Sequence, residues 1–135
     1  MSYTVQDLLE RKQPPVTVSP VETAKRSFEI MWDNGYSQLP VVSDQDIPLG
    51  LVTHESILRA LNHFQISLDQ LRVSAAKMSA STCKIGDSLF DVLEDLSEDY
   101  AVLVVNEDGK LAGILTQFDF SKFILRGEEG QGGTD

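Results

Sequence analysis

The sequence predicts a mixed α/β (α+β) fold built from two copies of a β-α-β-β-α unit. The first observation is an internal repeat. Leu39-Pro40-Val41-Val42 matches Val102-Leu103-Val104-Val105, and Gly50-Leu51-Val52-Thr53 matches Gly113-Ile114-Leu115-Thr116, in the same order and at the same spacing. The second is that helix and strand patterns follow one another in the same order in both halves. The third is the length of 135 residues, which suits one compact chain with a core of its own.

The first helix of the first copy is predicted to begin at Ser19-Pro20-Val21-Glu22, a capping box with proline at the first helical position. Asn34-Gly35 is a typical helix end. Apolar residues at three- and four-residue spacing indicate one buried face between these ends: Val21, Ala24, Phe28 and Met31.

A short strand near Thr17 is expected before this helix, and two strands, residues 38–43 and 48–53, are expected after it. The polar residues 44–46 form the turn between them. A second helix follows, and its inward residues are predicted to be Ile57, Leu58, Leu61 and Phe64.

The second copy repeats this order. A strand near Thr82 precedes a helix over 87–98, strands over 101–106 and 111–116 are joined by the hairpin turn Asp108-Gly109, and a helix covers 117–126. Short helical segments are expected over 4–9 and 73–78. The predicted boundaries are 1–66 for the first repeat with its N-terminal helix, 67–126 for the second repeat, and 127–135 for a disordered tail or linker.

The charge balance excludes several classes of partner. Eleven basic against 21 acidic residues give a net charge of −10, which disfavours nucleic acid and anionic membrane surfaces. No apolar run is long enough to span a bilayer. A single cysteine, Cys83, permits no internal disulfide and is expected to be a buried structural thiol. The sequence predicts a cytoplasmic protein without a membrane partner.

The tandem β-α-β-β-α unit, with each third strand ending in Gly-apolar-apolar-Thr before a helix, resembles a pair of CBS (cystathionine β-synthase) domains, a Bateman module. The resemblance covers about residues 4–125. It implies two repeats packed about a pseudo-twofold axis, with a cleft that can hold adenine nucleotides or S-adenosyl ligands. It also implies a homodimer and a regulatory rather than catalytic role, with no required cofactor.

Asp119 and Thr116 are the strongest candidates for ligand binding. A carboxylate has two acceptor oxygens and suits the two adjacent hydroxyls of a ribose, while Thr116 lies at a strand-to-helix junction where ribose or phosphate oxygens could be bound. The same pair is also an N-capping pattern, with an acid in the first helical turn. Both roles can coexist.

The family pattern adds further residues to the site built on Asp119. It points to Thr17 at the first strand, to Tyr36 and Ser37 before the second, and to Ile114 for the adenine slot. Tyr36 could equally be an ordinary half-buried aromatic. In the mirror site Ser56 stands where the acid would be, so we expect one good site and one degraded or empty site.

The predicted clefts are poor in cations, although Arg11, Lys12 and Lys84 could reach them. This favours a ligand of low charge, such as AMP or a neutral adenosyl compound, over ATP, with ADP and S-adenosylmethionine as further possible ligands. The alternative is a ligand-free dimerisation or scaffold module, which Ser56 and the lack of cations favour. No catalytic constellation is present, and His54 and His63 lack the spacing of a metal site.

Overall fold

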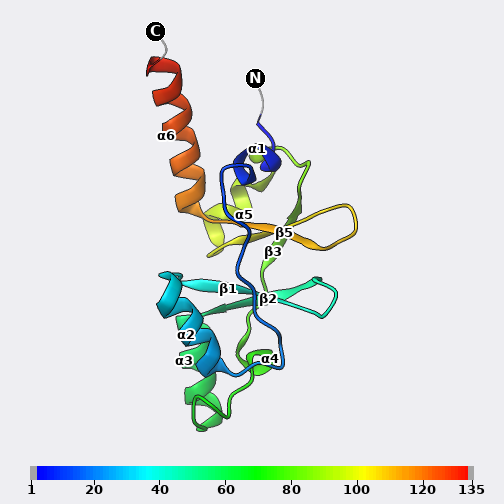
Figure 1. The fold of residues 1–135 in the computed structure, drawn as a ribbon, viewed down its shortest axis with the longest axis vertical. Coiled ribbons are helices and arrows are strands. Elements are labelled where there is room, and N and C mark those ends of the chain that lie inside the picture. The colour runs from blue at the N-terminus through cyan, green and yellow to red at the C-terminus, as the bar shows by residue number, and fades with distance from the viewer. Residues whose placement is uncertain (1–2, 134–135) are drawn as a thin grey trace. The chain divides into compact units, whose positions relative to one another are not determined.

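The computed structural model describes residues 3–133, and it describes side chains as far as Arg126. The described chain divides into two compact units (Figure 1). Residues 15–80 and 109–111 form one, here called the first-repeat unit. Residues 3–14, 81–108 and 112–133 form the other, the second-repeat unit. The fold is α+β, as the sequence predicts.

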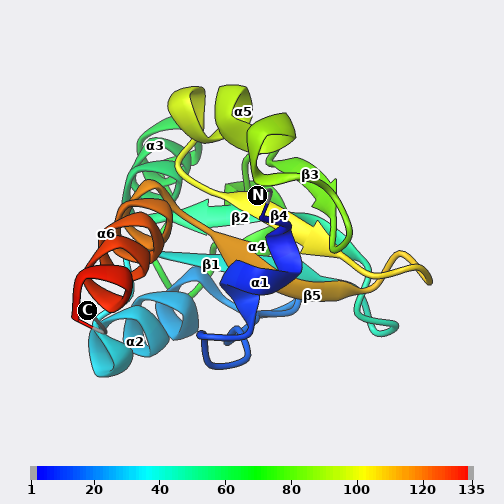
Figure 2. The same ribbon diagram turned by 90° about the horizontal axis from the view of Figure 1, so that it is seen from above.

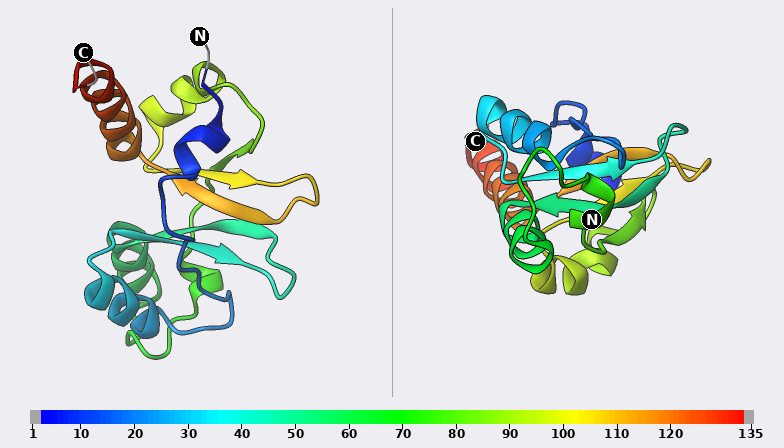
Figure 3. Two further views of the ribbon diagram at one scale, coloured as in Figure 1. Left: turned by 45° about the horizontal axis from the view of Figure 1, so that its top comes forward. Right: turned by 90° about the horizontal axis from the view of Figure 1, so that it is seen from below.

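The first-repeat unit is an antiparallel hairpin with helices on one side of it (Figures 1 and 3). Strands β1 (Gln38–Val42) and β2 (Pro48–Thr53) pair with Leu39 opposite Val52. The helices are α2 (Ala24–Asn34), α3 (His54–Phe64) and the short α4 (Val73–Ala76). The antiparallel pairing of both strands confirms the predicted hairpin, and Leu39 and Val41 of β1 and Val52 of β2 enter a buried cluster with the helices.

Helix α2 begins later than predicted. Thr23 is its N-cap and its hydroxyl accepts from Arg26 N, while Ser19 to Glu22 form a turn closed by Glu22 N donating to Ser19 O at 3.1 Å. Val21 is therefore 73% exposed and not part of the buried face. The predicted end at Gly35 is confirmed, because Gly35 adopts the left-handed conformation with φ 68°.

The buried face of α3 is narrower than predicted. Ile57 and Ala60 are buried and Leu61 packs against the core, but Leu58 and Phe64 are 58% and 47% exposed. Leu58 is one position from Ile57 and so points about 100° away around the helix. Phe64 is the last helical residue and lies at the edge of the packed layer.

The second-repeat unit has a three-stranded sheet in the order β3-β4-β5. The strands are β3 (Ser81–Lys84), β4 (Val102–Val105) and β5 (Leu111–Leu115), and β3 runs parallel to β4. The helices α1 (Val5–Leu9), α5 (Leu93–Glu98) and α6 (Gln117–Gly133) lie on one side of this sheet (Figures 1 and 2). The predicted helix over 87–98 is divided into a 3₁₀ turn η1 (Leu89–Val92) and α5.

Only one of the two predicted leading strands forms. The strand predicted near Thr82 is β3, whereas the one near Thr17 is reduced to a single parallel bridge between Val18 and Val41. Val18 N donates to Pro40 O and Val18 O accepts from Val42 N, both at 3.0 Å. Prolines at 14, 15 and 20 flank this segment and remove backbone donors, which keeps the pairing short.

The short helix that precedes each repeat in the sequence packs in the unit of the other repeat. The sequence predicts the N-terminal helix as part of a first repeat of residues 1–66, but α1 packs in the second-repeat unit, where Val5 N donates to Asp87 O at 2.8 Å. Val5 and Leu8 are 0% and 2% exposed and complete the core of that unit. Conversely, α4 belongs to the first-repeat unit through Val73 N donating to Glu22 O at 2.8 Å.

Helix α6 continues past Arg126, where the sequence predicted its end, to Gly133. Extending a formed helix costs far less than starting one, so the helix continues although residues 127–133 include four glycines. Residues 134–135 of the expected tail lie outside the described residues, and a linker role for 127–135 stays a prediction. Across residues 3–133 every helix is too short or too polar to cross a bilayer.

Candidate functional site

The junction between β5 and α6 holds the two residues that the sequence analysis ranked first. Asp119 Oδ2 accepts from Thr116 N at 3.0 Å and from Thr116 Oγ1 at 2.9 Å. In return, Asp119 N donates to Thr116 Oγ1 at 3.2 Å. This reciprocal pair is a capping box, so the capping role predicted for these residues is confirmed. It also fixes the position of the carboxylate at the start of α6.

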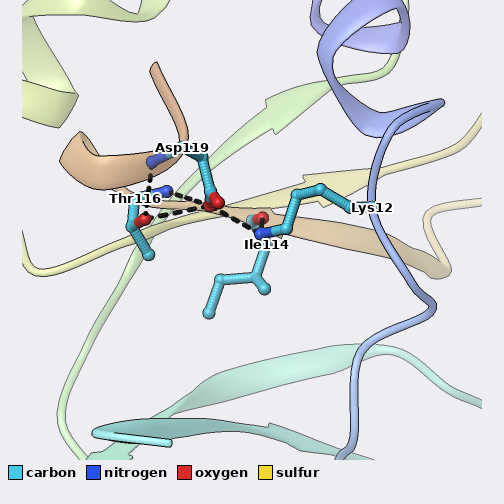
Figure 4. Close-up of polar contacts among 4 residues, drawn as sticks. All are labelled: Lys12, Ile114, Thr116 and Asp119. Carbon is cyan, nitrogen blue, oxygen red and sulfur yellow. Dashed lines mark hydrogen bonds and ion pairs between the residues drawn. The ribbon is translucent and has the colours of Figure 1, made fainter. Parts of the chain in front are cut away.

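A third residue, Lys12, is hydrogen-bonded to the same carboxylate (Figure 4). Its Nζ lies 2.6 Å from Asp119 Oδ2 and 2.5 Å from the backbone oxygen of Ile114. The side chains of Lys12 and Asp119 are 24% and 16% exposed, so most of the ion pair is shielded from water. Lys12 therefore bonds to two of the predicted site residues, Ile114 and Asp119, and Asp119 in turn bonds to Thr116.

The turn after α1 brings Lys12 to this place. Lys12 N donates to Leu9 O at 3.0 Å, which continues the helical turn beyond Leu9. Leu9 in turn lies against Gly113, where an added Cβ would come within 2.6 Å of Leu9 Cδ2. The absence of a side chain at Gly113 thus lets α1 approach β5 closely enough for the lysine to reach the next carbonyl along the strand.

The two carboxylate oxygens of Asp119 differ in what they can still bind. Oδ2 accepts three hydrogen bonds, from Lys12 and from two donors of Thr116. No donor among the described residues bonds to Oδ1. A carboxylate oxygen accepts about two hydrogen bonds, so Oδ1 is the atom open to a hydroxyl of a ligand.

A pocket opens beside this ion pair, between α1 and α6. Its volume is about 40 Å³, and Asp119, Lys12 and Arg11 line it together with Leu8, Lys122, Phe123 and Arg126. All of these residues belong to the second-repeat unit. Arg11 lies over the ring of Phe123, with its Cζ 4.9 Å from the ring centroid. Of the three basic residues that the sequence analysis considered, Arg11 and Lys12 line this pocket, whereas Lys84 is exposed on β3.

The corresponding junction of the first-repeat unit, between β2 and α3, has a different chemistry. Thr53 Oγ1 accepts from Ser56 N at 2.9 Å, and Ser56 Oγ accepts from Thr53 N at 2.9 Å and donates to Thr53 O at 3.1 Å. The hydroxyl of Ser56 is thus engaged with the backbone of Thr53. The capping geometry is the same as at Thr116, but the group at the position of Asp119 carries no charge.

The other predicted residues lie in the first-repeat unit. Thr17 is partly buried beside the bridge at Val18, and Tyr36 is 40% exposed. Ser37 Oγ donates to Gln38 Oε1 at 3.0 Å. The structure therefore brings Ile114, Thr116 and Asp119 together, and the assignment of Thr17, Tyr36 and Ser37 to a ligand stays a prediction. Lys12 closely follows a helix with a capping box, which is a local signal, but no local pattern indicates that its partner is Asp119.

Cys83 is 7% exposed on β3, as expected of a structural thiol. Burial, with smaller contributions from Asp87 and Asp95, raises the pKa of its thiol to about 12. Among the residues that the structure describes, no three histidine, cysteine or acidic side chains gather in a way that could hold a metal ion.

Comparison with known proteins agrees with the fold and with the repeat. The sequence model of the CBS domain matches residues 5–63 and 78–126. Over 110 residues the chain is 33% identical to an inosine-5'-monophosphate dehydrogenase from Haemophilus influenzae, a match that covers 80% of this chain and 22% of that relative. The chain thus spans about a fifth of the length of that enzyme.

Solved structures share the architecture. A conserved hypothetical protein from Geobacillus kaustophilus superposes with a TM-score of 0.80 at 22% identity, covering 93% of this chain and 98% of the other. A CBS domain protein from Pyrobaculum aerophilum, solved in complex with AMP, superposes with a TM-score of 0.76 at 24% identity, covering 87% of this chain and 89% of the other.

Proposed function

The chain belongs to the CBS domain family, and we propose that it is a regulatory module that binds an adenosine-containing ligand, an AMP-like nucleotide or an S-adenosyl compound, at Asp119. The observation that carries this proposal is the hydrogen bonding of the Asp119 carboxylate. Thr116 holds it in place through Oδ2, and Oδ1 keeps its acceptor capacity for a ribose hydroxyl. The AMP in the complex of the Pyrobaculum protein supports an adenine nucleotide as the ligand class.

The regulatory role follows from what ligand binding would change. A ligand shifts a conformational equilibrium only through its different affinity for the two states. Here a ribose hydroxyl at Oδ1 would share the charge of the Asp119 carboxylate with the ammonium of Lys12 at Oδ2, and Lys12 follows α1 in the chain. Ligand binding is therefore coupled to the contact between the turn after α1 and the start of α6.

A ligand-free dimerisation or scaffold module is the second candidate. The observation that favours it is the Lys12–Asp119 ion pair itself, because it satisfies the carboxylate without any ligand. The homodimer and the cytoplasmic location that the sequence predicts stay predictions under either function.

Isothermal titration calorimetry with adenosine, AMP, ADP, ATP and S-adenosylmethionine separates the two candidates. We expect at least one of them to bind. Asp119→Asn should weaken that binding about tenfold or more, because the amide removes the charge and one acceptor. Ser56→Ala is the matched control, since it changes the equivalent capping residue of the first-repeat unit.

Two outcomes would contradict the proposal. The first is that none of the five compounds binds at millimolar concentration, which favours the scaffold. The second is that Asp119→Asn and Ser56→Ala weaken binding equally, which would mean that the asymmetry between the two junctions has no bearing on the ligand. A thermal melt of each variant verifies that it is folded.

A further inference from the structure

We propose that Asn34 and Gly35 form a self-modification site, at which the asparagine loses ammonia and becomes aspartate or isoaspartate. Asn34 is the last residue of α2, and Gly35 connects the helix to the segment that leads into β1. Both residues are exposed, so water reaches them. The inference is independent of the proposed ligand site, because water is the only co-reactant that the modification needs.

The reaction begins at the backbone nitrogen of Gly35. Once this nitrogen has lost its proton, it attacks Cγ of Asn34 and forms a bond to it. The bond between Cγ and Nδ2 breaks, and Nδ2 leaves with the proton as ammonia, so that a cyclic imide remains. Water then opens the ring at one of its two carbonyl carbons. Opening at Cγ gives aspartate at position 34, whereas opening at the backbone carbon gives isoaspartate, which lengthens the main chain by one methylene group.

The residue after Asn34 is the first argument. The chain has asparagine at positions 34, 62 and 106, and glycine follows only the first of them, since histidine and glutamate follow the other two. A side chain on the following residue crowds the attacking nitrogen, and glycine has none. At Gly35 even an added Cβ would meet no described atom within 4 Å. The imide ring therefore has room to form.

The weak hydrogen bonding of the Gly35 nitrogen is the second argument. Its N–H is shared between the backbone oxygens of Met31 and Trp32, and the distance to Trp32 O is 3.4 Å. A donor at this distance is held only weakly. The shorter bond that closes the helix is the next one, from Tyr36 N to Met31 O at 2.9 Å. The attacking nitrogen is therefore not fixed by a short hydrogen bond of its own.

The Asn34 side chain provides a gate for the reaction. Its Nδ2 donates to the backbone oxygen of Ile30 at 2.8 Å, which holds the amide toward the preceding turn of α2. Attack by Gly35 requires this bond to open. The ends of helices open locally at a small cost in free energy, so the amide is released whenever the last turn frays. The rate in the folded protein is therefore the rate of the free amide multiplied by the open fraction of this turn.

The modification weakens the junction between α2 and β1. Both products lose the Nδ2 donor, and the new carboxylate cannot donate to Ile30 O. It also adds a negative charge beside Asp33 at the end of a helix whose last turn has no basic residue, where the helix dipole disfavours negative charge. In isoaspartate the longer main chain also displaces Tyr36 N from Met31 O.

Prolonged incubation of the full chain at neutral and at alkaline pH, followed by trypsin digestion and mass spectrometry, tests the site. Trypsin cleaves after lysine and arginine, so the three asparagines fall on separate peptides, 27–59, 60–72 and 85–110. We expect the mass gain of an amide converted to an acid to appear first in peptide 27–59 and to accelerate with pH. Asn62, which is exposed on α3, is the internal control. In urea-unfolded protein the conversion at Asn34 should be about tenfold or more faster than in folded protein, because the gate is then absent.

Two variants separate the modification from its effect on stability. Asn34→Gln should abolish the mass gain in peptide 27–59, because its longer side chain would have to close a larger ring. Asn34→Asp reproduces the charge of the first product and should melt at a lower temperature than Asn34→Gln. The proposal is overturned if Asn34 converts no faster than Asn62 in the folded protein, or if the rate does not rise with pH. Equal rates in folded and unfolded protein would disprove the gate, and equal melting of the two variants would disprove the effect on the junction.

Discussion

The ammonium of Lys12 lies 2.6 Å from the carboxylate of Asp119, although 107 positions separate the two residues in the chain. The contact links the turn after α1 to the first turn of α6 and satisfies the backbone oxygen of Ile114 at the same time. Because both side chains are largely shielded, removing one partner leaves a charge with little solvent around it.

The first prediction concerns the stability that this ion pair contributes. Lys12→Met should lower the free energy of unfolding by about 1 to 3 kcal/mol, because it removes two charge-assisted hydrogen bonds and leaves Asp119 without its cation. Urea unfolding of the parent, Lys12→Met, Asp119→Asn and the double variant gives the coupling energy, expected at about 1 kcal/mol.

Lys77→Met is the matched control for this cycle. Lys77 directly follows α4 in the first-repeat unit, as Lys12 closely follows α1 in the second, but it is exposed. Its substitution should change the unfolding free energy by less than about 0.5 kcal/mol. A coupling energy near zero between Lys12 and Asp119 would show that the ion pair has no net effect on stability.

The second prediction concerns the pH dependence at Cys83. Burial raises the pKa of its thiol to about 12, whereas an unfolded thiol ionises near pH 9. Between these two values the unfolded chain loses a proton that the folded chain keeps, so stability falls as pH rises through this window. The slope from this group is at most about 1.4 kcal/mol per pH unit.

Alkylation with iodoacetamide at pH 8 provides the direct measurement. In the native protein the thiolate fraction should be about 10³ times lower than in urea-unfolded protein, so modification should be slower by a similar factor. Equal rates in the native and unfolded protein would contradict the buried position of Cys83 on β3.

The third prediction compares two glycines at equivalent positions of the repeats. Gly50 has φ 152°, and a Cβ there would meet the backbone oxygen of Met78 at 2.5 Å. At Gly113 the nearest atom, at 2.6 Å, is the end of the Leu9 side chain, which can rotate. Gly50→Ala should therefore cost about 2 kcal/mol or more and Gly113→Ala about 1 kcal/mol, measured by urea unfolding. An equal or reversed order would be evidence against this account of the two contacts.

Local patterns predicted most of the fold and only part of the site. The hairpin strands and the cap at Thr116 and Asp119 follow from residues close together in the sequence, so the pattern alone was sufficient. The exchange of α1 and α4 between the repeats could not be read in this way, because a short helix with a few apolar residues fits either core. The partner of Lys12 was equally hidden, since pairing across 107 positions depends on where α1 packs.

The last prediction uses Lys12 to separate two effects on ligand binding. In the free protein its ammonium occupies Asp119 Oδ2 and the Ile114 oxygen, and the Ile114 oxygen is an acceptor that a nucleoside could use. Lys12→Met should therefore increase the affinity for adenosine about fivefold, since one more hydrogen bond to the ligand becomes available. AMP should gain less, because its phosphate loses a cation of the pocket. Calorimetry with both ligands gives the ratio of AMP to adenosine affinity, which should fall in Lys12→Met and stay unchanged in Lys77→Met. A loss of adenosine affinity in Lys12→Met would mean that the lysine binds the nucleoside rather than competing with it.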